Sequence, residues 1–373
     1  MYDLLLKKAK LVSGEIYDIA IHNGTILDID KNINTNDFKK IIELKDNQYV
    51  SAGWIDLHTH SYTGLKLYSD NPDEIGLKSG VTTVVDTGTA GALNIEDFYN
   101  LLKQYKTNVY AFLNISKTGI VQQNELSDLS NIDLELIKSS IEKYPDFIIG
   151  LKARMSKSVV GDNGILPLKL ALEAKDQNNH MPLMVHIGTK PPQIEGILSL
   201  LGEDDILTHC YHGKENGLFD KDGNPKDELL KALDRGLHLD VGHGKESFSF
   251  KVAGQGRSAK IYPHSISTDI YFRNRIHGPV FNMATTLSKF LYLGYSLEEI
   301  IPLVTINPAK AINLTKKGRL EKDMDADITI FTLYDEEIEL VDSLGTVVKG
   351  NKKVMPLAVV LNGEYIDLKE VEL

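Results

Sequence analysis

The amino-acid sequence predicts an α/β protein, a (β/α)8 TIM barrel with a small β-sandwich-like domain formed by both chain termini. Three observations lead to this prediction. Strand-like and helix-like segments alternate through the middle of the chain, which is typical of a parallel barrel. Strand-like hairpins occupy both ends of the chain. Several predicted barrel strands are followed by polar side chains, at the face where barrel active sites lie.

The predicted domain boundaries follow this change of pattern. Residues 1–50 and 316–373 form the small β domain, and residues 51–315 form the barrel. Each end carries an Asn-Gly pair between two strand-like runs, Asn23-Gly24 near the start and Asn362-Gly363 near the end. Asn-Gly supplies the two positive φ angles of a type I′ turn, so we expect an antiparallel hairpin at each end.

The barrel requires eight strands with helices between them. The strand candidates are Trp54–Leu57, Thr82–Asp86, Val109–Ile115, Phe147–Lys152, Pro182–His186, Ile206–Thr208, Leu237–Val241 and Ser265–Thr268. The helix candidates include Asn94–Gln104, Asp133–Lys143, Leu168–Gln177, Lys226–Arg235 and Phe281–Leu293. The long stretch from Gly242 to Pro263 is rich in Gly and Ser, and we expect it to be a loop on the active face.

Composition narrows the class of function. The chain has 373 residues, of which 42% are hydrophobic, and a net charge of -11 without blocks of Lys or Arg, which argues against nucleic-acid binding. No apolar stretch is long enough to span a bilayer, and the first residues lack the form of a signal peptide. Cys210 is the single cysteine. We expect a cytoplasmic protein with a small-molecule substrate and no membrane partner; a homo-oligomer is one open option.

Two histidines, His58 and His60, end the first predicted barrel strand. Residues i and i+2 of a strand point to the same face, so the two imidazoles are directed toward one point. Such a pair can hold a metal ion. Taken alone, such a pair is weak evidence for a metal, because it is more often two hydrogen-bonded side chains at a strand end.

Four later strand ends supply further possible ligands, namely Lys152, His186, His209 and Asp269. Strand ends converge on one pocket in a barrel, so we expect all six side chains to form one metal site. Each residue has an ordinary alternative: a salt-bridged lysine, core histidines, or a helix N-cap for the aspartate. The joint occurrence of all six favours the metal site.

The lysine requires a chemical explanation, because a protonated amine does not bind a cation. Burial lowers the pKa of a lysine, and the neutral amine can take up CO2 to form a carbamate. The two oxygens of a carbamate on Lys152 can then bridge two metal ions.

The chain resembles the amidohydrolase superfamily of metal-dependent hydrolases over nearly its whole length. The resemblance rests on the segments Gly53–His60, Gly80–Asp86, Thr305–Ala311, Gly318–Leu320 and Asp325–Ile330. It implies two divalent ions, with zinc as the expected metal.

The same resemblance assigns the ligands. It implies that His58, His60 and Asp269 hold one ion and that the two later histidines hold the other. A carboxylated Lys152 then bridges the two ions. A hydroxide that bridges the metals attacks the substrate carbonyl, and Asp269 takes its proton and passes it to the leaving group.

Within the superfamily the sequence is most similar to the deacetylase-type, dihydroorotase-like branch. The cues are Gly150–Arg154, His186–Gly188, Thr208–Gly213 and Asp240–Gly244. This similarity implies hydrolysis of an amide or ester of a small acylated carboxylic acid. The alternatives are a cyclic amidohydrolase of the dihydroorotase or hydantoinase kind, a deaminase, or a scaffold protein on the same fold.

Three residues are candidates for substrate contacts. Arg154 lies two residues beyond Lys152 on the same strand face, and it either clamps a substrate carboxylate or pairs with a nearby acid. His212 and His243 lie on loops of the active face. Each of them either contacts substrate or packs within its loop.

Overall fold

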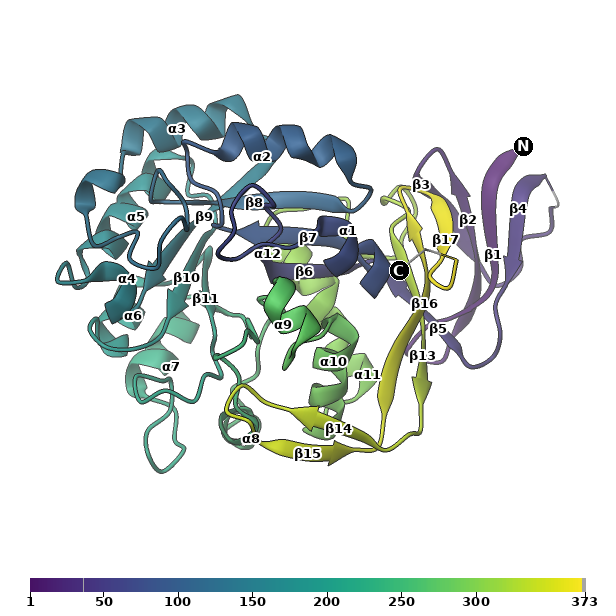
Figure 1. Cartoon of the computed structure of the whole chain (residues 1–373). Coiled ribbons are helices and arrows are strands. Elements are labelled where there is room, and N and C mark those ends of the chain that lie inside the picture. The colour runs from purple at the N-terminus through teal and green to yellow at the C-terminus, as the bar shows by residue number, and fades with distance from the viewer. Residues whose placement is uncertain (36, 371–373) are drawn as a thin grey trace.

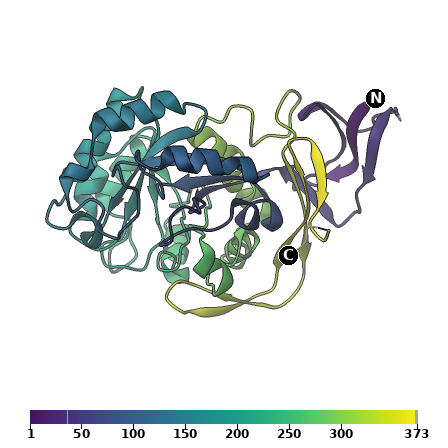
Figure 2. The same cartoon turned by 45° about the horizontal axis from the view of Figure 1, so that its top comes forward.

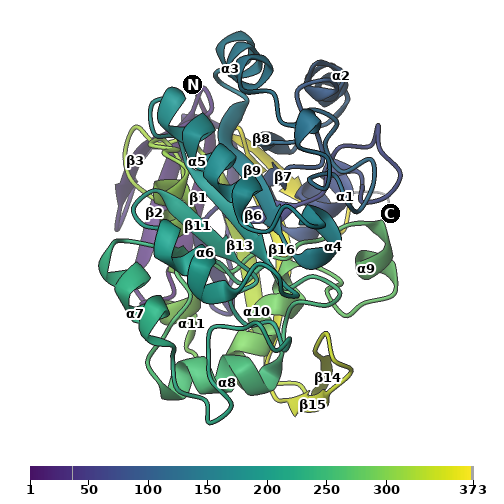
Figure 3. The same cartoon turned by 90° about the vertical axis from the view of Figure 1, so that its left-hand side faces the viewer.

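The computed structural model describes residues 1–35 and 37–370. A curled parallel sheet with helices around it forms one part of the molecule, and a twisted sheet that contains both termini lies beside it (Figure 1). Viewed from the side, the helices surround the strands of the curled sheet (Figure 3). This arrangement is the mixed α/β architecture that the sequence predicts.

The parallel sheet has the same strand order in space as in the chain. Its strands are β6 (Trp54–Thr59), β7 (Val81–Thr87), β8 (Asn108–Asn114), β9 (Ile148–Met155), β10 (Leu183–Ile187), β11 (Asp205–Thr208) and β12 (His238–Leu239). The first two are buried at every residue, as expected of strands covered on both faces. Seven of the eight predicted barrel strands are therefore confirmed in type and order.

The eighth predicted strand, Ser265–Thr268, is not a regular strand. Its first residue makes an isolated parallel bridge to Asp240, and the residue after Asp269 makes another to Thr59. The backbone cannot continue as a strand because Asp269 has a φ of 49°, in the left-handed region. The segment nevertheless joins the two edges of the sheet, which is consistent with a TIM-like barrel.

The helices that follow the strands include all five that the sequence predicts. They are α1 (Pro72–Ile75), α2 (Ile95–Leu101), α3 (Leu134–Lys143), α4 (Lys157–Val160), α5 (Leu166–Gln177), α6 (Ile194–Leu200), α7 (Asp227–Asp234), α8 (Phe250–Ser258), α9 (Phe272–Ile276), α10 (Met283–Tyr292), α11 (Leu297–Ile300) and α12 (Ile306–Ala311). Short 3-10 helices are η1 (Leu77–Ser79), η2 (Leu102–Gln104), η3 (Leu129–Asn131) and η4 (Pro302–Val304). Asp133 and Asn282 cap α3 and α10 by accepting backbone N–H groups at 3.0 and 2.8 Å. Over the residues described, none of the helices is long and apolar enough to cross a membrane.

Helix α8 corrects one prediction, because it lies inside the stretch Gly242–Pro263 that we expected to be a loop. Glycine is a poor helix former, and this helix contains two. One of them is needed for packing: a Cβ on Gly256 would lie 2.6 Å from Cε1 of Tyr211. The glycine that close packing requires therefore lowers the helix propensity of this segment, and for this reason the sequence did not predict a helix here.

The second sheet combines segments from the two ends of the chain. It contains β1 (Tyr2–Lys10), β2 (Ile16–His22), β3 (Thr25–Asp30), β4 (Phe38–Glu43), β5 (Gln48–Ala52), β13 (Ile328–Tyr334), β16 (Lys353–Leu361) and β17 (Glu364–Asp367). The order is β17-β16-β13-β5-β1-β2-β3, and β4 pairs with β1. Its division from the barrel as a separate, sandwich-like domain stays a prediction.

Both predicted Asn-Gly hairpins are present in this sheet. Asn23 and Gly24 have φ angles of 50° and 74°, and Asn362 and Gly363 have 51° and 84°. The two turns also touch, since a Cβ on Gly363 would lie 2.8 Å from Cα of Gly24. The turns thus bring the two ends of the chain together.

A third feature was not predicted. Strands β14 (Ile338–Val341) and β15 (Val347–Gly350) form an antiparallel hairpin of their own. This hairpin leaves the terminal sheet between β13 and β16 and extends along the barrel to α8 (Figures 1 and 2). We call it the β14–β15 arm.

Candidate metal centre

The six predicted ligands come together at the carboxyl ends of the parallel strands. Ligand atoms of His58, His209 and Asp269 all lie within 4.8 Å of one another. Oδ1 of Asp269 is 3.1 Å from Nε2 of His60, and the rings of His186 and His209 are centred 4.6 Å apart. Side chains distant in sequence therefore face one small volume.

Lys152 lies at the centre of this group and is almost fully buried. Its Nζ is 3.4 Å from Nε2 of His58, and it forms no ion pair with any residue in the described ranges. Burial lowers the pKa of Lys152 to about 7. A substantial fraction of this amine is therefore neutral near neutral pH, as uptake of CO2 requires.

A buried hydrogen-bond relay fixes the orientation of His58. The hydroxyl of Thr208 donates to Oδ2 of Asp240 at 2.7 Å, and its oxygen lies 2.8 Å from Nδ1 of His58. Because the hydroxyl proton is committed to the carboxylate, this oxygen must accept the Nδ1–H of the imidazole. Nε2 of His58 is left with a free lone pair that faces the centre.

A similar relay holds His60, whose Nδ1 lies 2.7 Å from the hydroxyl oxygen of Thr89. The backbone N–H of Thr89 donates to Oδ1 of the buried Asp86 carboxylate at 2.9 Å, which fixes the position of this residue. Nδ1 of His209 donates directly to the carbonyl oxygen of Gly242 at 2.6 Å. Partners of this kind select the tautomer of a metal-binding histidine and hold its ring.

The protonation states also suit a metal. Burial lowers the pKa of His58 and His186 well below the usual range and that of His209 to about 4. These imidazoles are therefore neutral at pH 7 and can donate a lone pair. Neutral histidines, one aspartate and a neutral amine form a donor set that fits divalent cations.

The backbone is unusual at two of the candidate ligands. His209 and Asp269 have φ angles of 68° and 49°, which are uncommon for residues other than glycine. Such conformations cost about 1–3 kcal/mol each and cluster at functional sites. Gly242 and Gly244 allow this crowding, because a Cβ on either would collide with Thr208 or Asp269 respectively.

A cavity of about 410 Å3 opens above the candidate ligands. Arg154 lines it, as predicted, and donates from Nη2 to Oε1 of Gln123 at 3.1 Å. The acid considered as an alternative partner also exists, since Nε of Arg154 lies 3.4 Å from Oε1 of Glu125. Glu125 is buried behind the arginine, and burial raises the pKa of its carboxyl. Arg154 is thus close to a buried acid, to which its Nε makes no hydrogen bond, and it lines the cavity.

The other two predicted substrate-binding residues do not line this cavity. His212 is buried, and its Nδ1 accepts the backbone N–H of Lys214. His243 is buried as well, with Nδ1 directed at the carbonyl oxygen of Gly244 and Nε2 2.8 Å from Nζ of Lys289. Both histidines are therefore buried and lie outside the lining of this cavity, and a substrate contact by either of them stays a prediction.

Sequence reasoning missed the residues that hold the ligands. Thr89 and Thr208 give no sequence signal, because their role depends on which histidine lies beside them. Asp86 and Asp240 could have been found, since each follows or ends a barrel strand, as the ligands do. Glu125 lies in an irregular segment without any motif.

Comparison with known proteins agrees with this geometry. The chain is 47% identical to a protein named "Deacetylase" from Enterococcus faecalis, over 98% of this chain and 99% of that protein. This chain belongs to the amidohydrolase family. The sequence profile of the Amidohydrolase family matches residues 225–366. The prediction of a hydrolase that acts on carbon–nitrogen bonds is confirmed at this level.

Two solved structures extend the comparison of this amidohydrolase. One is described as the crystal structure of an adenine deaminase; it is 47% identical, with a TM-score of 0.97 and coverage of 98% of this chain and 100% of that chain. Another is described as a dihydroorotase; it is 34% identical, with a TM-score of 0.89 and coverage of 98% and 99%. The names differ, so similarity does not choose the substrate.

The relay to His58 leads to a prediction about metal affinity. Thr208→Val keeps the shape of the side chain but removes the acceptor for Nδ1–H, so the imidazole loses its fixed orientation. We expect zinc affinity to fall about 10- to 100-fold, the range for loss of an outer partner of a ligand. Competition with a chromophoric chelator measures it. Thr208→Ser retains the hydroxyl and should bind zinc normally; equal affinities for the two variants would contradict the relay.

The pairing of Lys289 with His243 leads to a prediction about stability. Burial lowers the pKa of Lys289 to about 7, whereas the unfolded chain keeps its lysine protonated to much higher pH. Between these pKa values the unfolded state binds more protons, so stability rises with pH. Relative to Lys289→Met, the wild type should gain about 2 kcal/mol between about pH 6.5 and 8.5. Urea unfolding at several pH values tests this, and parallel pH curves for the two proteins would refute it.

Proposed function

We propose that this amidohydrolase is a metal-dependent deacetylase that cleaves the amide or ester bond of a small acylated carboxylic acid. The observation that carries the proposal is the buried amine of Lys152, surrounded by neutral histidines beside a cavity that Arg154 lines. The relative named "Deacetylase" supports it. We also propose that the fold is a complete (β/α)8 barrel, with residues 265–270 in the eighth strand position.

In this proposal His58, His60 and Asp269 would hold one divalent ion, and His186 and His209 would hold a second. Lys152, as a carbamate, would supply further oxygen ligands, and zinc is the expected metal. Metal ions bound there would supply Lewis acidity and a nucleophilic water near neutral pH. Thr208, which Asp240 holds through its hydroxyl, and Thr89, which Asp86 holds through its backbone N–H, keep the first two histidines oriented for this task.

Asp269 is the proposed proton carrier. Its side chain is 16% exposed and lines the cavity, so its carboxylate can reach a bound substrate. It accepts a proton from the attacking water and returns it to the leaving nitrogen or oxygen, as general base and then general acid. The same carboxylate then ends each cycle unprotonated.

Arg154 is the proposed carboxylate clamp. A guanidinium has five N–H donors, and among the described side chains Arg154 donates one hydrogen bond, to Gln123. The buried Glu125 lies near the group, with Oε1 3.4 Å from Nε of Arg154. Lys214 and Lys245 also line the cavity, which gives it further positive charge for an anionic substrate.

A cyclic amidohydrolase is the second candidate, favoured by the similarity to the dihydroorotase structure. Such an enzyme opens a ring amide with the same donor set, so the substrate alone separates the two candidates. A deaminase is disfavoured by Lys152, because deaminases of this superfamily usually use one metal and no bridging lysine.

An activity screen tests the proposal. The metal-loaded protein is offered N-acyl amino acids and O-acyl hydroxy acids of both chiralities, together with dihydroorotate, hydantoins and adenine. Hydrolysis of the acyl acids with release of acetate is the expected result. Turnover confined to the ring amides, or to adenine, would replace the proposed function.

Lys152 provides a second test. Native mass spectrometry should show one CO2 adduct that acid denaturation removes, and elemental analysis should show about two divalent ions per chain. Lys152→Ala should be inactive because the bridge is lost, and a short-chain carboxylate such as propionate should partly restore activity. A Lys152→Ala protein that is active without any additive would contradict the bridge.

Asp269 separates metal binding from proton transfer. Asp269→Asn keeps an oxygen that can coordinate weakly but cannot accept a proton. We expect this variant to retain more metal than His58→Ala while kcat falls at least about 100-fold. Metal analysis and steady-state kinetics on the same samples provide the comparison. Turnover of a metal-loaded Asp269→Asn protein near the wild-type rate would assign proton transfer to another group.

A further inference from the structure

Part of the cavity wall is a short turn with little support of its own. Lys245, Glu246 and Ser247 line the cavity, and the first two are exposed. Within the described part of the chain these three residues make no backbone hydrogen bond of standard geometry outside the turn at 244–246, and Glu246 forms a 3.8 Å ion pair with Lys214. The position of the turn must therefore be set where the chain enters and leaves it, at Gly244 and Phe248.

One residue of the β14–β15 arm contacts both of these points. The hydroxyl of Ser343 donates to the carbonyl oxygen of Gly244 at 2.9 Å, and its oxygen accepts the N–H of Phe248 at 3.2 Å. The backbone N–H of Ser343 also donates to the carbonyl oxygen of Phe248 at 2.9 Å. A single hydroxyl thus bridges the entrance and the exit of the turn, with its donor and acceptor capacity both used.

The neighbours of Ser343 hold the tip of the arm in place. Asp342 is buried; its Oδ2 accepts the first N–H of α8, from Phe250, at 3.1 Å. Its Oδ1 accepts the N–H groups of Leu344 and Thr346 at 2.9 and 2.8 Å, which closes the tip. Leu344 packs against Gly213, where a Cβ would lie 2.6 Å from its Cδ1.

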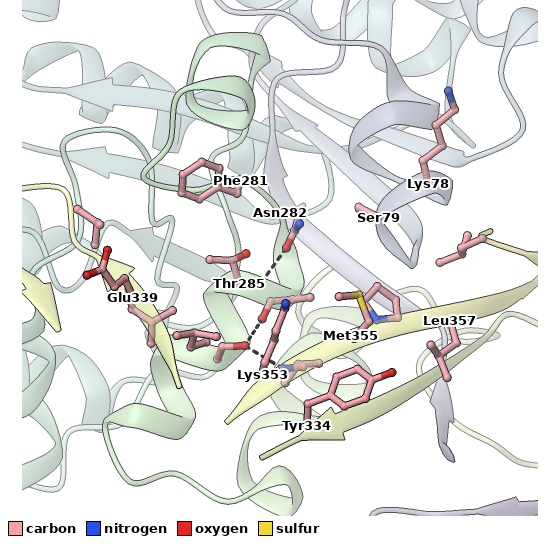
Figure 4. Close-up of a pocket in the computed structure, with 18 of the residues that line it drawn as sticks. Lys78, Ser79, Phe281, Asn282, Thr285, Tyr334, Glu339, Lys353, Met355 and Leu357 are labelled. Atoms are coloured by element: carbon pink, nitrogen blue, oxygen red, sulfur yellow. Dashed lines mark hydrogen bonds between the residues drawn. The ribbon is translucent and has the colours of Figure 1, made fainter. Parts of the chain in front are cut away.

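Packing beneath the arm is incomplete, so hydrogen bonds at the tip contribute to holding it. A cavity of about 600 Å3 is lined by β14, β16, α10 and η1, although β16 still contacts α10, where the N–H of Val354 donates to the hydroxyl of Ser288 at 3.0 Å. Figure 4 shows its walls, with Glu339 on the arm, Asn282 and Thr285 at the start of α10, and Lys78 and Ser79 on the opposite side. The tip is therefore held by directed hydrogen bonds as well as by packing.

We infer that Ser343 is a positioning residue for the substrate cavity. It acts through the turn 244–248, on the wall formed by Lys245, Glu246 and Ser247, and leaves the candidate metal ligands unchanged. The ladder between residues 242–244 and 267–268 supports this separation, because it holds the start of the loop independently of the arm. The inference rests on the proposed function only in assigning the substrate to this cavity.

The test compares three variants of the full-length protein. Ser343→Ala removes the bridging hydroxyl, Ser343→Thr retains a hydroxyl, and Thr346→Ala is the matched control on the same tip. The hydroxyl of Thr346 makes no hydrogen bond to any described residue. The rate of amide hydrogen exchange in the peptide that covers residues 243–250 measures the stability of the turn without any substrate. The zinc content of the protein measures whether the candidate metal centre is intact.

For Ser343→Ala we expect at least threefold faster exchange in this peptide, unchanged exchange in the peptide around His58 and unchanged zinc content. With the acyl acid that the wild type hydrolyses fastest, KM should rise about threefold to tenfold while kcat stays within twofold, as loss of one or two modest hydrogen bonds implies. Ser343→Thr should restore both values, and Thr346→Ala should match the wild type.

Unchanged exchange at residues 243–250 in Ser343→Ala would overturn the inference whatever the substrate proves to be. A parallel loss of zinc and kcat would also overturn it, because Ser343 would then act through the metal centre. If exchange quickens but the acyl acids are not hydrolysed even by the wild type, the proposed substrate fails and the positioning role stands.

Discussion

The buried carboxylate of Asp240 is the interaction on which the site depends. Its oxygens accept hydrogen bonds from three hydroxyls, at 2.7 Å from Thr208, 2.6 Å from Ser265 and 2.6 Å from Ser267. These residues belong to β11 and to the irregular eighth segment, so one carboxylate ties together the part of the ring that lacks regular strand pairing. Through Thr208 it also sets the tautomer of His58 on β6. The same carboxylate therefore both links β11 to the eighth segment and, through Thr208, orients the candidate ligand His58.

This solution has an electrostatic cost. Asp56, Asp86 and Asp240 are all buried, and no lysine or arginine in the described part of the chain forms an ion pair with them; burial raises the pKa of each, that of Asp56 to about 7. Hydrogen bonds from hydroxyl and backbone groups offset only part of the desolvation of a carboxylate. Divalent ions among the nearby histidines would offset more, because a bound ion is the largest local charge in such a site. The neutral imidazoles can thus hold the positive charge that would offset the desolvation of the buried carboxylates.

The arm shows how a distant part of the chain can affect the same cavity. Ser343 follows the last barrel helix and belongs to neither the barrel nor the terminal sheet. Its hydrogen bonds nevertheless close the turn that carries Lys245. The wall near the candidate ligands comes from strand ends, whereas the wall formed by Lys245, Glu246 and Ser247 comes from a loop held by a hairpin. Separate support of this kind allows the substrate side to vary without disturbing the ligands.

The sequence by itself determined the architecture and the six candidate ligands, because both follow from local rules: strand alternation, Asn-Gly turns, and the convergence of strand ends in a barrel. It could not show the irregular eighth segment, since the left-handed backbone of Asp269 arises from crowding against Gly244 and from pairing with the first strand. The sequence could not show that His243 lies outside the cavity lining, because the residue that pairs with it, Lys289, comes from a helix distant in the chain. Thr208 and Ser343 acquire their roles only from neighbours distant in the chain. A hydroxyl has the same local signature wherever it lies, so only the tertiary structure decides which histidine or which loop it holds.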